Sequence, residues 1–257
     1  DQKFPVNDDM KEDAATIIKQ IKSAYKSNYG DNYKDSLNQA LTSAGYKNLS
    51  EYRQRMIKQI QYANFLLDYI DDHFDDVFND YYQQCAPKYV SLIKISVSDT
   101  SSPADDETSK LNEVKELISN TDKSFGDIAQ DYSDDSTSSK KGSLGIVDSK
   151  DTSGIANSYG KDVFNAIESL SEGQVSDVIT GDNGYYFAKV TSTDKKTLKK
   201  ELKKTDIDSP LLAYDDYLQY VVYNSYKINY KDKDIKKIVQ EVVNKALEER
   251  KTERGEA

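Results

Sequence analysis

The chain has 257 residues, of which 37% are hydrophobic and 31% charged, and its net charge is −10. This length allows one large domain or two ordinary ones. The acidic balance argues against a nucleic-acid-binding protein, because phosphate binding depends on clustered lysine and arginine. Lysines form a run only in residues 195–204, which we interpret as a solvated helix face, the alternative being contact with an anionic surface.

Cysteine usage and hydropathy limit the class further. The single cysteine, Cys85, excludes an intrachain disulfide. No apolar run approaches the roughly 18 residues of a membrane span. The first residues show neither a start methionine nor a signal peptide, which is compatible with a trimmed chain that has lost a signal or a lipid anchor.

Residues 8–84 are predicted to be helical. Asp8 or Asp9 can cap a first helix ending near Gly30, and a second helix spans about residues 35–44. A third begins at a capping-box-like pair, Asn48 with Glu51. It continues in an apolar stripe at helical spacing, comprising Leu49, Tyr52, Met56, Ile60, Ala63, Leu67 and Ile70. A short helix then leads to Pro87.

The pattern changes after Pro87. Alternating and β-branched residues predict strands, at residues 89–97, 142–147, 175–180 and 185–190. Helical spacing predicts helices between them, at residues 103–118, 125–132 and 161–170. A loop rich in serine, aspartate and lysine spans residues 133–141. This order predicts a small α+β domain over residues 88–192.

Residues 195–205 and 210–250 are again predicted to be helical. Helical ends around an α+β centre favour an insertion. We therefore expect an N-terminal segment, residues 1–87, and a C-terminal segment, residues 193–257, to form one all-helical lobe with the central domain inserted.

Four segments of the centre carry spaced motifs. They read FGDIAQDYS from Phe125, a loop ending KKGSLG at Gly145, LSEGQVS from Leu170 and GYYFAKV from Gly184. In this order and spacing they resemble the motifs of the parvulin family of peptidyl-prolyl isomerases. The flanking helices resemble those of PrsA-type extracellular foldases and, more distantly, SurA-like chaperones.

The resemblance implies a parvulin-like small antiparallel-sheet domain in a helical chaperone lobe. It implies a folding factor that binds unfolded or newly secreted polypeptides, without a cofactor. It also implies a lipoprotein on the extracellular face of the membrane, anchored through a lipid absent from this sequence, and a homodimer formed through the helical lobe.

Parvulins hold proline in an apolar pocket beside two histidines and a cysteine or aspartate. By position, the resemblance carries the aspartate onto Asp135 and a pocket leucine onto Leu144. The pocket phenylalanine falls on Phe164, with Val163 as a competitor. In the turn Gly181–Gly184, Asn183 is a further candidate for substrate binding.

The two family histidines are replaced. Leu92 occupies one position and Tyr186 the other, and the only histidine of the chain is His73, in the N-terminal helical part. A leucine cannot hydrogen-bond, whereas a tyrosine keeps a hydroxyl. The resemblance therefore implies a degenerate isomerase site built on Asp135, Leu92 and Tyr186.

Other site classes find no support in the sequence. The acidic cluster Asp131, Asp134 and Asp135 lacks the glycine turn and terminal glutamate of a calcium loop, so we expect no metal site. Three functions stay open: a foldase or holdase, an active isomerase with an altered site, and a non-catalytic surface interaction protein.

Overall fold

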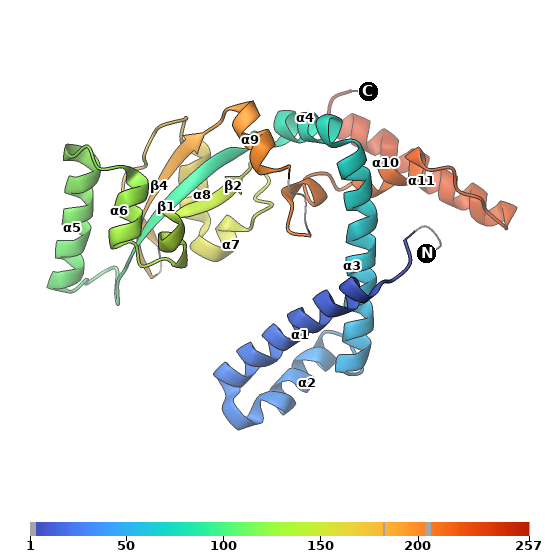
Figure 1. The fold of residues 1–257 in the computed structure, drawn as a ribbon, viewed down its shortest axis with the longest axis horizontal. Helices are drawn as coiled ribbons and strands as arrows, with labels where there is room; N and C mark the ends of the chain where they lie inside the picture. Colours follow the sequence, from blue (N-terminus) through green and yellow to red (C-terminus); the bar gives the residue numbers. More distant parts are fainter. Residues whose placement is uncertain (1–3, 182, 204–206, 257) are drawn as a thin grey trace. The chain divides into compact units, whose positions relative to one another are not determined.

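The computed structural model describes residues 4–181, 183–203 and 207–256. It divides into two compact units (Figure 1). A helical unit combines residues 4–73 with residues 207–208 and 216–256, and a sheet unit combines residues 74–203 with residues 209–215. The predicted fold class is confirmed: a small antiparallel sheet domain is inserted between two chain segments that form one helical lobe.

The helical unit contains α1 (Asp8–Tyr29), η1 (Gly30–Asn32), α2 (Tyr33–Ser43), α3 (Leu49–Asp72), α10 (Leu218–Ser225) and α11 (Lys233–Glu253). Both α1 and α2 contact α3, and α10 contacts α3 and α11. The α1–α3 core comprises Met10, Ala14, Ile18, Met56 and Ile60.

Side-chain caps explain where these helices begin. Asn7 Oδ1 accepts a hydrogen bond from the Met10 amide, and Asn48 Oδ1 accepts one from the Glu51 amide, both at 2.9 Å. Each bond satisfies an amide that the first helical turn leaves without a backbone partner. The predicted Asn48 start of the third helix is confirmed.

The sheet unit contains α4 (Phe74–Cys85), β1 (Lys88–Ser96), α5 (Asp105–Asn120), α6 (Phe125–Tyr132), η2 (Ser136–Lys140), β2 (Ser143–Val147), α7 (Ile155–Tyr159), α8 (Lys161–Ser169), β3 (Ile179–Gly181), β4 (Gly184–Ser192), α9 (Lys195–Glu201) and η3 (Pro210–Leu212). The strand order is β2-β1-β4-β3, antiparallel throughout.

The two faces of the sheet carry separate cores. Helices α5 and α6 cover one face, around Ile93, Ile95 and Phe187. Helices α7 and α8 cover the other face, around Val90, Leu92 and Ala188. Because side chains alternate along a strand, β1 supplies neighbouring residues to opposite cores.

Two predicted elements are shorter than expected. The strand predicted at 175–180 is β3, Ile179–Gly181, preceded by an isolated bridge between Val175 and Lys189. Beside that bridge the Ser176 hydroxyl accepts from the Ala188 amide at 2.9 Å, so a side chain takes the place of a ladder carbonyl. Of the helix predicted at 195–205, α9 covers 195–201, and residues 204–206 lie outside the described part.

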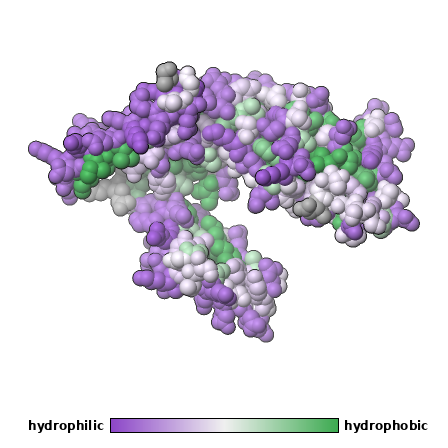
Figure 2. Space-filling view, turned by 180° about the vertical axis from the view of Figure 1, so that it is seen from behind, coloured by the Kyte–Doolittle hydropathy of each residue, from purple (hydrophilic) through white to green (hydrophobic). Residues whose placement is uncertain are grey.

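The C-terminal helical prediction is interrupted. Between α10 and α11, residues 226–232 form no helix, and α11 begins at an Asp232 cap. Figure 2 shows a mostly hydrophilic surface with separate hydrophobic areas, as expected for a chain that is 31% charged.

Candidate functional site

The α7/α8-covered face of the sheet holds most of the predicted site residues. In the β1–β4 register, Leu92 lies opposite Ala188 and Lys94 lies opposite Tyr186. Leu92 and Tyr186 therefore share this face, where they are diagonal neighbours on adjacent strands. Leu144 and Phe164 pack against the same cluster from β2 and α8.

Burial separates these residues into two layers. Leu92 is 0% exposed and Tyr186 only 2%, so both lie beneath the surface. Asp135, Leu144 and Phe164 are half-buried, and Asn183 is exposed. A peptide bound on this face would contact the half-buried residues Asp135, Leu144 and Phe164. Leu92 and Tyr186 would lie beneath that contact layer.

Val163 and Phe164 both belong to the cluster. Val163 is fully buried in its centre, and Phe164 packs at its margin with part of the ring exposed. The position of α8 is held by Lys88, whose Nζ donates to the carbonyls of Ile167 and Leu170 at 3.1 Å. A lysine at a helix C-terminus satisfies free carbonyls and opposes the negative end of the helix dipole.

Asp135 caps the short helix η2. Its Oδ1 accepts hydrogen bonds from the amide of Thr137 at 2.9 Å and from the Thr137 hydroxyl at 2.7 Å. The Tyr159 hydroxyl approaches the same oxygen at 3.4 Å. The carboxylate is thus held at the edge of the apolar cluster rather than within it.

Tyr159 links Asp135 to Tyr186. Its ring meets the Tyr186 ring edge-on, with centroids 6.2 Å apart and an angle of 81°. The Tyr186 hydroxyl donates to Asn183 Oδ1 at 2.6 Å. The structure therefore brings Asp135, Tyr159, Tyr186 and Asn183 into one polar line across the apolar face.

No sequence motif pointed to Tyr159, because we predicted no element between residues 148 and 160. The available signal was local: Ile155 and Tyr159 are spaced as i and i+4 between two glycines. Gly154 and Gly160 have φ of +69° and +99° and bound the single turn of α7. That turn points both side chains at the sheet.

We expect the Tyr159 phenol to ionise only at unusually high pH. Burial and the Asp135 carboxylate raise the pKa of Tyr159 to about 12, against about 10 for a free tyrosine. Because the pKa is higher in the folded state, Tyr159 contributes to the stability of the folded state. This contribution is complete below pH 10 and is lost as the pH rises towards 12. The tyrosinate absorbance of the wild type minus that of Tyr159→Phe should show this transition near 12. A transition near 10 would contradict the buried contact.

The arrangement offers apolar contact for binding a peptide rather than groups for transferring a proton. Isomerisation of an X–Pro bond makes and breaks no bond to carbon; it requires rotation over a barrier of about 18–20 kcal/mol set by amide resonance. An apolar wall that favours the twisted amide lowers this barrier by binding the transition state. Here the wall and one carboxylate are present, Leu92 offers no hydrogen bond, and the Tyr186 hydroxyl donates to Asn183.

The lone histidine is remote in sequence from this face. His73 ends α3 in the helical unit, with Nδ1 2.9 Å from the Tyr69 carbonyl oxygen and its ring stacked on that tyrosine. Within residues 4–181, 183–203 and 207–256, no group of three or more His, Cys, Asp or Glu side chains could hold a metal ion. No helix in this part of the chain is long and apolar enough to cross a bilayer.

Comparison with protein families identifies the central domain. Residues 92–192 match the rotamase family described as the PPIC-type PPIase domain. These residues form a PPIC-type rotamase domain. The predicted parvulin resemblance is thereby confirmed, and the match begins at Leu92.

Curated relatives extend the likeness beyond the rotamase domain. The chain is 32% identical over 141 residues to foldase protein PrsA of Staphylococcus epidermidis, covering 52% of this chain and 41% of that protein. The figures for PrsA of Staphylococcus aureus, strain bovine RF122, are the same. The match thus spans about two-fifths of the length of these relatives. The resemblance to PrsA-type foldases is confirmed at this level.

Two solved structures are similar over most of the chain. PrsA from Bacillus subtilis is 21% identical, with a TM-score of 0.39, over 91% of this chain and 81% of that one. Foldase protein PrsA from Streptococcus pneumoniae is 18% identical, with a TM-score of 0.42, over 90% and 81%. The family assignment rests on the sequence matches.

Proposed function

We propose that this protein is a protein-folding factor of the PrsA type that binds unfolded or proline-containing segments of client polypeptides. The observation that carries the proposal is the half-exposed wall of Leu144, Tyr159 and Phe164 on the rotamase domain, edged by the Asp135 carboxylate. Similarity to proteins named foldase supports the same role.

We further propose that binding exceeds turnover. Leu92 and Tyr186 replace the family histidines, and both are buried under the residues that a peptide would touch. A proline-limited refolding assay tests this proposal. A client whose aggregation is suppressed while its slow phase keeps the uncatalysed rate is the expected result. An accelerated slow phase would instead support the active isomerase, and no preference for unfolded clients would favour a fixed-partner interaction protein.

We expect the double substitution Leu92→His with Tyr186→His to raise the isomerase rate. Positions 92 and 186 are diagonal neighbours on one face, about 7–8 Å apart, so two imidazoles can reach each other. A tenfold gain, about 1.4 kcal/mol of barrier, is the minimum expected. The measurement is cis–trans exchange in a short X–Pro peptide by NMR.

The single change Leu92→His is the control for this experiment. It places an imidazole without its partner in an apolar cluster, which lowers stability and gives no gain in rate. A double variant that folds but isomerises no faster than the wild type would show that the pocket has been remodelled.

Location and assembly complete the proposal. The PrsA resemblance supports a place on the extracellular face of the cell membrane, attachment through a lipid anchor, and clients that are newly secreted. It also supports a homodimer through the helical unit. Membrane fractionation of the natural protein and sedimentation of the chain at several concentrations test these two points.

A further inference from the structure

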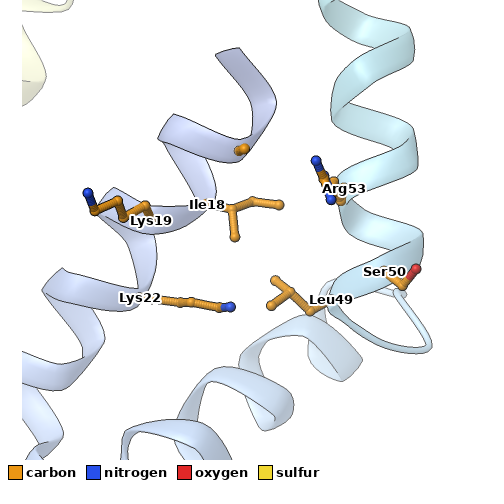
Figure 3. Close-up of a pocket in the computed structure, with 7 residues that line it drawn as sticks. Ile18, Lys19, Lys22, Leu49, Ser50 and Arg53 are labelled. Carbon is orange, nitrogen blue, oxygen red and sulfur yellow. The ribbon is translucent and has the colours of Figure 1, made fainter. Parts of the chain in front are cut away.

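The helical unit contains an open hollow between α1 and the start of α3. Its volume is about 480 Å³. Figure 3 shows Ile18 pointing from α1 towards α3 and Leu49 facing it, with Lys22 beside them. Lys19 and Arg53 complete the cationic margin. The hollow thus has an apolar floor and a rim of three cations.

These cations are available to a ligand. Lys19, Lys22 and Arg53 are exposed, and within the described ranges none of them forms an ion pair with a carboxylate. The acidic residue nearest to Arg53 in sequence is Glu51, and its carboxylate accepts a hydrogen bond from the Lys47 amide at 2.9 Å. The rim therefore keeps its positive charge.

The surrounding helices concentrate this charge. Residues 14–29 of α1 and residues 52–67 of α3 each contain three lysines or arginines and no aspartate or glutamate, in a chain with 45 acidic residues against 35 basic ones. The three basic residues of α1 and the three of α3 are more than twenty residues apart in sequence, so they do not form one basic run. The α1–α3 packing brings them to one place.

An apolar floor with a cationic rim fits a peptide in which apolar side chains alternate with carboxylates. The floor formed by Ile18, Leu49 and Ala15 admits one or two apolar side chains, and the rim attracts acidic groups on either side. A bilayer surface is a worse fit, because it needs exposed apolar residues that project outwards, and Ile18 is only 7% exposed.

We infer that the α1–α3 hollow is a binding site for acidic-apolar segments of unfolded polypeptides. This inference rests on the proposed folding function and names the class of client segment that the helical unit selects. It concerns a surface separate in sequence from the rotamase domain, so it predicts binding of segments that contain no proline.

Labelled proline-free peptides test the inference with the full chain. One peptide alternates leucine with glutamate, a second leucine with glutamine, and a third serine with glutamate. By fluorescence anisotropy at low salt, the leucine–glutamate peptide should bind about three- to tenfold more tightly than either of the others, as expected for two or three exposed ion pairs over a small apolar contact. Raising the salt concentration should reduce the advantage over glutamine.

The double variant Lys22→Met with Arg53→Met keeps the aliphatic stems and removes two charges. It should abolish the preference for glutamate over glutamine. The matched control is Lys196→Met with Lys200→Met on α9, which removes two exposed lysines from the sequence run and should leave the preference unchanged. A preference that survives in the first variant, or disappears in the control, overturns the assignment to this hollow.

Two further results separate the possible failures. If the protein suppresses client aggregation but binds glutamate and glutamine peptides equally, the inference is wrong and the proposed folding function stands. If it neither suppresses aggregation nor binds any peptide, both are wrong. Binding to phosphatidylglycerol vesicles that depends on Lys22 and Arg53, with no peptide binding, would overturn the choice of a peptide ligand.

Discussion

Replacing Gly142 by alanine is expected to destabilise the rotamase domain by about 3 kcal/mol. Gly142 has φ of +75°, a conformation that L-residues adopt only at a cost. A Cβ atom there would lie 2.4 Å from the Leu92 carbonyl oxygen and 2.8 Å from Ala129 Cβ. The backbone cannot retreat freely, because the Gly142 carbonyl accepts from the Leu92 amide at 2.8 Å.

Gly145→Ala is the matched control for this prediction. Gly145 has nearly the same φ, +78°, but a Cβ there would meet nothing within 4 Å. Its loss should be about 1 kcal/mol, the cost of the conformation alone. Urea unfolding followed by circular dichroism measures both, and equal losses would show that the contact of Gly142 with β1 does not matter.

The second large effect is expected for Asp148→Ala, at about 3 kcal/mol. The Asp148 carboxylate is fully buried and accepts hydrogen bonds from the Tyr81 hydroxyl at 2.8 Å, the Lys150 amide at 3.0 Å, and the hydroxyl and amide of Thr152. Without the carboxylate, buried donors lose their acceptor, which costs more than a hydrogen bond contributes.

The Tyr81 hydroxyl is the donor most affected. Burial raises the pKa of Tyr81 far above its usual range, so the hydroxyl stays protonated and needs an acceptor. Tyr81→Phe removes that donor together with its need, and should cost less than Asp148→Ala, about 1–2 kcal/mol. Asp177→Ala, at an exposed site of the same unit, should change the unfolding free energy by less than about 0.5 kcal/mol.

The destabilisation caused by Asp148→Ala should be confined to the segments that contact the Asp148 network, which distinguishes it from a general loss of stability. Tyr81 lies in α4, and its ring meets the Tyr214 ring edge-on at 5.4 Å, while Lys150 Nζ donates to the Tyr214 carbonyl at 2.8 Å. The Asp148 network therefore holds both α4 and residues 209–215 against the rest of the sheet unit. Amide exchange by NMR should show faster exchange in these segments in Asp148→Ala, and unchanged exchange would contradict the prediction.

The candidate site could be predicted only in part. Leu144 and Tyr186 lie within the spaced motifs, Asp135 lies between two of them, and Leu92 lies in the first predicted strand. Such motifs report one strand or turn at a time. Tyr159 could not be found this way, because its role depends on α7 folding back onto the sheet. Nor could sequence distinguish the buried layer of Leu92 and Tyr186 from the half-exposed layer above it.

The amino-acid sequence by itself determined the fold class and the rotamase domain, because periodicity, glycine positions and short motifs are local properties of the chain. Only the tertiary structure decided the Asp135–Tyr159–Tyr186–Asn183 line and the cationic hollow at Lys22 and Arg53. These features join residues far apart in sequence, and packing of apolar faces, which is not directional, brings them together.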